Sequence, residues 1–266
     1  MPHGTALVTG ASAGIGRAIA EEFARNGYDL VLVARREEKL QEAANEFEQY
    51  GSTAHVVPTD LGTRENREDL YEEVTEERGI EVDTLVNNVG IGTQGKYTDI
   101  PADRDLLQIE LNITTPSHLT KLFGADMVER GDGRILNVAS SAAFQPGPFM
   151  AVYYASKAYL LSFSEALHEE LKEDGVTVTA LCPGPVETEF QARAENEDAP
   201  IGGGEHDGLM SINWQDAVDV AEAGYEGVHD GEAVVVTGTD LKVLSRVVPL
   251  LPRSTVRKLS RSLNEA

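Results

Sequence analysis

Short apolar runs recur along the chain, and the longer segments between them carry apolar residues at helical spacing. The short runs predict strands near residues 5–9, 29–34, 54–58, 83–87, 133–138, 176–182 and 233–237, with helices between them. Strands that alternate with helices form a parallel sheet that is covered on both faces. We therefore expect an α/β fold, a single domain built on a doubly wound parallel sheet of about seven strands.

The segment after the first strand, residues 9–16 (Thr-Gly-Ala-Ser-Ala-Gly-Ile-Gly), opens a helix that places Ile15, Ile19 and Phe23 on one face. Glycines allow a tight turn and a close backbone approach to a pyrophosphate, and the new helix presents unpaired N–H groups to the anion. A plain tight turn is the alternative, and the strand-turn-helix context favours the nucleotide site. The predicted phosphate contacts are Thr9, Gly10, Ser12, Ala13, Gly14, Ile15 and Gly16.

A second motif, Tyr153 and Lys157, lies in a segment with helical apolar spacing over residues 152–171. Residues four apart share one face of a helix. A lysine ammonium beside a phenol lowers the pKa of the tyrosine, which makes it a proton donor and acceptor nearer neutral pH. The alternative is a buried tyrosine beside a lysine whose methylene groups pack against it. Because the phosphate cradle is in the same chain, we prefer the acid–base interpretation.

The motifs Thr-Gly-x-x-x-Gly-x-Gly at residues 9–16 and Tyr-x-x-x-Lys at residues 153–157 resemble those of the short-chain dehydrogenase/reductase family. The resemblance implies a Rossmann-like domain over residues 1–240, with residues 241–266 as a C-terminal tail. It also implies hydride transfer between a nicotinamide cofactor and a carbonyl or secondary-alcohol substrate, and residues 140–167 look most like ketoacyl and hydroxysteroid reductases. The alternative on the same fold is a catalytically silent, NADP-sensing regulatory protein, which has no need of an acid–base pair.

The resemblance implies further cofactor contacts at the ends of three predicted strands. The third strand ends at the pair that meets the adenine ring, the fourth is followed by a segment similar to Asn-Asn-Ala-Gly, and the sixth leads to the loop beside the nicotinamide. These contacts are Asp60 and Leu61, then Asn87, Asn88, Val89 and Gly90, in which valine replaces the usual alanine, and finally Pro183, Gly184, Val186 and Thr188.

The same resemblance implies the catalytic set Asn112, Ser140, Tyr153 and Lys157. In the reducing direction Tyr153 gives a proton to the carbonyl oxygen and Ser140 hydrogen-bonds that oxygen. Lys157 binds the nicotinamide ribose and tunes the tyrosine, and Asn112 supports the proton relay. Ser140 precedes Tyr153 by 13 residues, as in the family, whereas the adjacent Ser141 lies near the substrate or begins the following loop.

Cofactor preference is argued from charge. An NAD site needs a carboxylate at the end of the second strand to accept from the ribose 2′-hydroxyl. This chain has Ala34 there, followed by Arg35 and Arg36, and Arg17 follows the last glycine of the cradle. Positive charge at a helix N-terminus opposes the helix dipole, and a 2′-phosphate would compensate it. We expect NADP(H) to be favoured over NAD(H), with solvated surface arginines as the alternative.

The chain is strongly acidic, with 45 acidic against 22 basic residues and a net charge of −23. Self-repulsion of this size destabilises a compact state in dilute buffer, and a screening electrolyte relieves it. We interpret the excess as adaptation to a high-salt cytoplasm, because the carboxylates are spread along the chain instead of forming one acidic face for a basic partner. The same charge disfavours nucleic-acid binding.

The tail, residues 241–266, is basic where the rest is acidic, and its apolar residues recur at helical spacing on both sides of Pro252. This pattern predicts two short amphipathic helices. Such helices can lie on an anionic membrane surface, or they can fold back on the body or pair with another subunit. We favour a clasp within the chain or between subunits, and we expect a homo-oligomer, a dimer or tetramer.

The remaining features are few. The chain has a single cysteine, Cys182, which excludes an intrachain disulfide and which we expect to pack at a strand end. The six histidines lack metal-ligand spacing, so no metal is expected. Without a signal peptide or a membrane-spanning apolar run, we expect a cytoplasmic protein. The polar, glycine-rich segment 188–211 predicts a mobile flap over the substrate or, alternatively, a disordered loop.

Overall fold

The computed structural model describes residues 3–186 and 214–265. Within them seven strands form one parallel sheet in the order β3-β2-β1-β4-β5-β6-β7. The strands are β1 (Thr5–Thr9), β2 (Asp29–Ala34), β3 (Ala54–Pro58), β4 (Thr84–Asn87), β5 (Gly133–Val138), β6 (Val176–Cys182) and β7 (Val234–Val236). From β1 the chain adds β2 and β3 on one side, and it then adds β4 to β7 on the other side of β1. The strand order thus reverses between β1 and β4, and such a switch point opens a crevice at the carboxyl ends of the strands.

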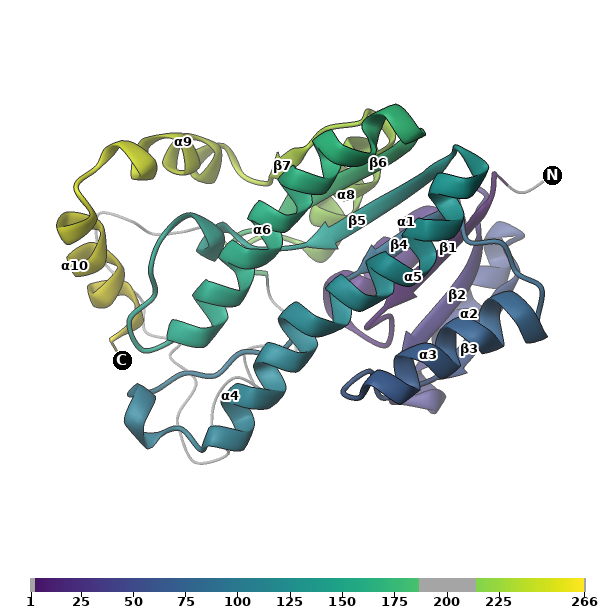
Figure 1. The fold of residues 1–266 in the computed structure, drawn as a ribbon, viewed down its shortest axis with the longest axis horizontal. Coiled ribbons are helices and arrows are strands. Elements are labelled where there is room, and N and C mark those ends of the chain that lie inside the picture. Colours follow the sequence, from purple (N-terminus) through teal and green to yellow (C-terminus); the bar gives the residue numbers. More distant parts are fainter. Residues whose placement is uncertain (1–2, 187–213, 266) are drawn as a thin grey trace.

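Helices cover both faces of the sheet, which confirms the predicted doubly wound fold (Figure 1). The two larger buried apolar clusters lie on opposite faces of the sheet, because alternate strand residues face opposite sides: β1 contributes Ala6 and Val8 to one cluster and Leu7 to the other. The described helices are α1 (Gly14–Arg25), α2 (Glu37–Phe47), α3 (Arg64–Glu72), α4 (Ala102–Ile109), α5 (Thr115–Arg130), α6 (Ala151–Leu171), α8 (Ala217–His229), α9 (Thr239–Val247) and α10 (Arg253–Asn264).

Two of the acidic helices are followed directly by a turn of another kind. A 3₁₀ turn at Glu48–Tyr50 follows α2, after which Gly51 adopts a φ of 83°. A π turn at Glu73–Glu77 follows α3. The predicted flap, residues 188–211, lies outside the described residues, and so does Thr188.

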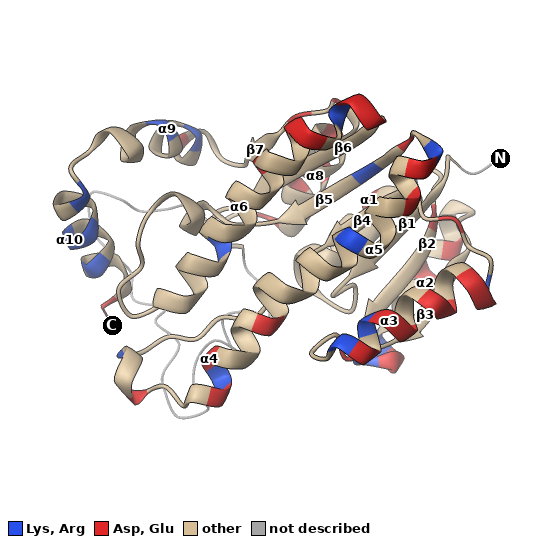
Figure 2. Ribbon diagram, viewed as in Figure 1, with Lys and Arg blue, Asp and Glu red and all other residues tan. Residues whose placement is uncertain are grey.

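The tail forms two helices, α9 and α10, joined by a 3₁₀ turn at Val248–Leu250. Leu241, Val248 and Val256 are buried against the body, whereas Leu259, which the spacing placed on the same apolar face, is 43% exposed. Basic residues gather on α9 and α10, while acidic residues spread over α2, α3 and the carboxyl end of α6 (Figure 2). Among the described residues, the ion pair that involves these tail cations is Arg261 with Glu265, and none joins them to the acidic body.

No helix in the two described ranges is long and apolar enough to cross a membrane.

Candidate active site

The glycine cradle lies between β1 and α1 and is tied to the segment after β4. The Thr9 hydroxyl donates to the Val86 carbonyl (3.1 Å) and accepts from the backbone N–H of Asn88 (2.9 Å). A Cβ atom on Gly16 would lie 2.2 Å from Asn88 Nδ2 and 2.5 Å from the Gly10 carbonyl oxygen. The cradle therefore has no room for a side chain at this position, and Gly10 (φ 71°) adopts a conformation that favours glycine.

The N-terminus of α1 keeps its amide groups available. Ala13 is the N-cap, and within the described chain no side chain caps the helix and no acidic residue lies in its first turn. The first N–H groups of a helix need an external acceptor when no cap supplies one. The residues at this end of α1 therefore suit an anionic ligand.

The three arginines that we assigned to a 2′-phosphate differ in their surroundings. Arg17 forms an ion pair with Glu46 of α2, so a residue of this chain already compensates its charge. Arg36 donates from Nη2 to the Ser12 hydroxyl (3.2 Å) and so lies at the rim of the cradle. Arg35 is exposed at the same end of β2. The structure therefore brings Arg36 to the predicted phosphate contacts. The ion pair contradicts the premise that no residue of the chain compensates Arg17, whose contact with the cofactor stays a prediction.

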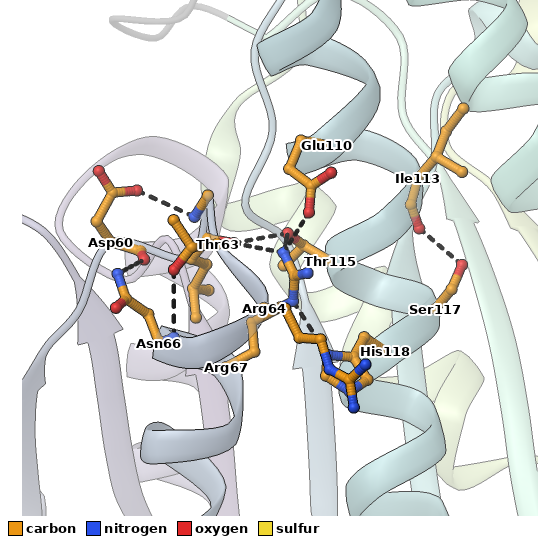
Figure 3. Close-up of polar contacts among 12 residues, drawn as sticks. Asp60, Thr63, Arg64, Asn66, Arg67, Glu110, Ile113, Thr115, Ser117 and His118 are labelled. Atoms are coloured by element: carbon orange, nitrogen blue, oxygen red, sulfur yellow. Dashed lines mark hydrogen bonds and ion pairs between the residues drawn. The ribbon is translucent and has the colours of Figure 1, made fainter.

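The predicted adenine pair ends β3 at the same edge of the sheet. Asp60 is exposed, and its Oδ1 accepts from the Gly62 N–H (3.1 Å). Asn66 holds the Asp60 carbonyl from α3 (2.6 Å, Figure 3). Leu61 is only 3% exposed. Backbone and carboxylate at this position are thus held by local hydrogen bonds.

Tyr153 and Ser140 form a hydrogen-bonded pair. Burial raises the pKa of Tyr153 to about 12, and the hydrogen bond with Ser140 acts in the lowering direction. The adjacent Ser141 does something different: its backbone N–H donates to the Pro183 carbonyl (2.8 Å). Of the two serines, the structure pairs Ser140 with the tyrosine.

Lys157 is 5% exposed and donates from Nζ to the Val138 carbonyl at the end of β5 (2.7 Å). Its Nζ lies 5.9 Å from the centre of the Tyr153 ring. Burial lowers the pKa of Lys157 to about 8. The expected lowering of the Tyr153 pKa by the lysine is therefore wrong for this structure, because burial disfavours the charged form of both groups.

Asn112 lies on a π turn, Glu110–Thr114, between α4 and α5. Its Oδ1 accepts from the Ile91 N–H, and its Nδ2 donates to the Ile91 carbonyl (both 2.9 Å) and to the Ser156 hydroxyl (3.0 Å). A Cβ on Gly90 would lie 3.1 Å from Asn112 Oδ1 and 3.6 Å from Lys157 Nζ. The turn therefore links the segment after β4 to α6.

The segment after β4 is held from two sides. Asn87 donates from Nδ2 to Thr120 Oγ1 (3.1 Å) and to Asn137 Oδ1 (2.9 Å), so it serves the packing of β4 against β5. Val89 donates its N–H to the Thr9 hydroxyl (3.2 Å). Valine fits where the family has alanine, because Val89 packs against a buried apolar cluster.

The loop after β6 brings in residues that the sequence patterns did not single out. Gly184 donates its N–H to Gln215 Oε1 (3.3 Å), and Val186 forms a parallel bridge with Gln215. A Cβ on Gly184 would lie 2.5 Å from Leu241 Cδ1, so the tail packs on the predicted nicotinamide loop. Cys182 is buried at the end of β6, as expected, and burial raises its pKa to about 12. Gln215 and Leu241 stand in no recognisable spacing with the motifs, and the fold alone places them here.

Comparisons with known proteins agree with this geometry. The family model described as short chain dehydrogenase matches residues 4–199. A very-long-chain 3-oxoacyl-CoA reductase from Anas platyrhynchos is 40% identical over 191 residues, 70% of this chain and 60% of the length of that protein. A short-chain dehydrogenase from Sphingobium yanoikuyae in complex with NADPH has a TM-score of 0.80 at 28% identity, over 94% of this chain and 92% of that one.

A short chain dehydrogenase/reductase from Burkholderia phymatum in complex with NAD also has a TM-score of 0.80, at 26% identity and with 92% of each chain covered. The family model covers well over half of this chain, and strands β1 to β6 and both motifs lie within the region it matches. The chain belongs to the short-chain dehydrogenase family of oxidoreductases.

Proposed function

We propose that this protein is an NADP(H)-dependent oxidoreductase that acts on a carbonyl or secondary-alcohol substrate. The observation that carries the proposal is the hydrogen bond between Ser140 and Tyr153. Tyr153 lies on α6, the helix that also holds the buried Lys157. A nucleotide sensor has no need of this acid–base arrangement, and the related proteins described above are named as a reductase and as dehydrogenases.

The cradle residues fit a nicotinamide dinucleotide. The space that a Gly16 side chain would fill and the uncapped start of α1 suit a pyrophosphate. Asp60 and Leu61 would hold the adenine, and Gly90, Pro183 and Gly184 would border the nicotinamide. When bound, the cofactor supplies or accepts the hydride.

The acid–base residues act on the substrate oxygen. With a pKa raised to about 12, Tyr153 is protonated at neutral pH, which suits a proton donor in the reducing direction. The Ser140 hydroxyl, already beside the phenol, would donate to the same carbonyl oxygen. Lys157 would hold the nicotinamide ribose, and Asn112 would support the path that returns a proton to Tyr153.

NADP(H) preference rests on two arginines at the end of β2. Arg36 reaches the cradle through Ser12, and Arg35 is exposed beside it. Ala34 ends β2 and offers no carboxylate to a ribose 2′-hydroxyl. The similar solved structures include one with NADPH and one with NAD, so they do not favour either cofactor. Support for NADP(H) therefore comes from the arginines of this chain.

The substrate class that we propose is a carbonyl compound with an apolar chain, of ketoacyl or hydroxysteroid type. A cavity of about 230 Å³ lies between the loop after Ser140 and the tail. Its lining is mostly apolar, with one cation: Phe144, Pro146, Val248, Pro249, Val256 and Arg253. The activity printed for the Anas platyrhynchos protein, on very-long-chain 3-oxoacyl-CoA, is of the same class.

We also propose that the tail is a clasp that completes the substrate side of the molecule and that the protein works as a dimer or tetramer in a high-salt cytoplasm. Leu241 packs against the predicted nicotinamide loop at Gly184, which supports the clasp. The net charge of −23 supports the salt adaptation.

A carbonyl screen tests the main proposal. Purified protein is mixed with NADPH or NADH and a panel of 3-oxoacyl thioesters, ketosteroids and simple ketones, and cofactor absorbance is followed. Turnover of at least one class with NADPH is expected. Tight NADPH binding without turnover of any carbonyl or alcohol would favour the sensor instead.

A further inference from the structure

Arg67 is the largest fully buried side chain in the described part of the molecule, at 2% exposure. It lies on α3, away from the proposed acid–base residues. Arginine is almost never fully buried unless it is paired, because an uncompensated guanidinium is costly to remove from water. The partners of Arg67 therefore show what its burial achieves.

The guanidinium joins three segments (Figure 3). Nη1 donates to the Leu61 carbonyl (2.9 Å), to Glu110 Oε1 (2.7 Å) and to the Thr115 hydroxyl (3.2 Å). Nε donates to His118 Nδ1 (3.1 Å). Burial and then the charge of Arg67 lower the pKa of His118, which agrees with a neutral ring that accepts this bond.

Two of these segments belong to the proposed cofactor and relay sites. Leu61 is the buried half of the adenine pair, and Thr115 donates to the same Leu61 carbonyl (2.9 Å). Glu110 and Thr115 stand at the two ends of the π turn that carries Asn112. Arg67 thus bridges the proposed adenine pair and the Asn112 turn, and the hydrogen-bond partners named above include none of Ser140, Tyr153 and Lys157.

We propose that Arg67 is a positioning residue that holds the adenine-binding segment and the Asn112 turn in register, so that adenine binding and proton relay depend on one buried guanidinium. The inference rests on the proposed function, because it assigns Leu61 and Asn112 the roles given above. A shift of one segment against the other displaces Asn112 from Ile91 and Ser156, which fix its orientation.

The test compares Arg67→Met with Arg64→Met in the full chain. Arg64 is on the same helix, 78% exposed, and forms an ion pair with Glu68, four residues further along that helix. Binding of 2′,5′-ADP and 5′-ADP by calorimetry reports on the adenine segment without turnover. We expect Arg67→Met to lower the affinity for whichever of the two nucleotides binds more tightly by about tenfold or more. We expect kcat to fall by a similar factor, since small misplacements of groups in a site carry such costs. Arg64→Met stays within about twofold in both.

A double-mutant cycle separates positioning from simple destabilisation. If Arg67 acts through Asn112, the loss in kcat caused by Arg67→Met shrinks when Asn112 is already alanine, whereas an independent effect adds in full. Thr115→Val removes one bridging hydroxyl without stranding a charge, and it replaces Arg67→Met in every measurement if that variant does not fold.

The outcomes are distinct. An active wild type in which these variants lower the melting temperature but leave nucleotide affinity and kcat within about twofold overturns the inference. Full additivity with Asn112→Ala also overturns it. A wild type that binds neither nucleotide and reduces no carbonyl refutes the proposed function itself, and the inference fails with it.

Discussion

The Tyr154 hydroxyl donates to Asn264 Oδ1 at 3.1 Å, which joins α6 to the last turn of the tail across 110 residues of sequence. Asn264 in turn donates from Nδ2 to the Pro148 carbonyl (3.0 Å). Gln94 donates to the Asn264 carbonyl from the loop after β4 (3.4 Å). One residue of the tail therefore contacts three segments around the proposed catalytic tyrosine.

Deleting residues 241–266 should lower the melting temperature or change the oligomer while leaving NADPH binding intact, because the described contacts of the tail are with Pro148, Tyr154 and Gly184 and not with the glycine cradle. Light scattering, thermal melts and NADPH titration of both forms measure this. Asn264→Ala, which removes only the bonds to Tyr154 and Pro148, should reproduce part of the stability loss.

The competing role for the tail is contact with an anionic membrane. Its outward face carries Val243 (60% exposed) and Leu250 (82% exposed) among its basic residues. Liposome flotation of the full-length protein alone, with stability and oligomer size unchanged by the deletion, would contradict the clasp.

Changing Tyr153 to phenylalanine should reduce turnover by about a hundred- to ten-thousandfold, because the ring remains and the proton donor is lost. NADPH affinity should change little. Steady-state kinetics and cofactor titration check both. Tyr159→Phe, on the same helix and 40% exposed, is the control. The assignment is wrong if Tyr153→Phe stays active and Tyr154→Phe is the inactive variant.

Replacing Arg35 with aspartate should abolish the preference for NADPH, because a carboxylate repels the 2′-phosphate and can accept from a 2′-hydroxyl. Arg36→Ala should lower kcat/KM with NADPH more than kcat/KM with NADH, since Arg36 lies beside Ser12 at the cradle. The ratio of kcat/KM for the two cofactors measures each effect. A wild type that prefers NADH would refute the proposal before any variant is made.

Thermal stability should rise from low to molar KCl, because the Debye length falls from about 10 Å at 0.1 M to about 3 Å at 1 M and the acidic residues repel each other less. Melting curves over a KCl series check this. A sucrose series at matched osmolality is the control for effects other than screening. A melting temperature that is flat or falls with KCl would argue against salt adaptation.

Lys157 should make stability depend on alkaline pH. Its pKa is 10.5 ordinarily and about 8 in the folded protein, so between these values the unfolded chain binds a proton that the folded chain lacks. Stability from this group therefore rises with pH over that window. The Tyr153 pKa, raised from 10.0 to about 12, acts oppositely only above pH 10.

Denaturant unfolding of wild type and Lys157→Met at pH 8 and pH 10 measures the effect. The wild type should gain about 2 kcal/mol relative to the variant over this interval. Lys121→Met, at an exposed position of α5, should track the wild type. Parallel pH profiles for wild type and Lys157→Met would show that burial does not perturb the lysine.

The sequence by itself determined the sheet and the two motifs. Strand positions agree with the structure to within a residue at β4 and β7, because runs of buried apolar residues are a local property of the chain. The four-residue spacing of Tyr153 and Lys157 likewise placed both on α6 without any knowledge of packing.

Tertiary structure decided what each motif residue contacts. Compensation of Arg17 by Glu46 and burial of Arg67 among Leu61, Glu110 and Thr115 join elements far apart in sequence. Burial also set the direction of the Tyr153 pKa, which the neighbouring lysine alone would have lowered. Periodicity reports which face of an element is covered, but which side chain covers it depends on how the elements pack, and no spacing in the sequence encodes that.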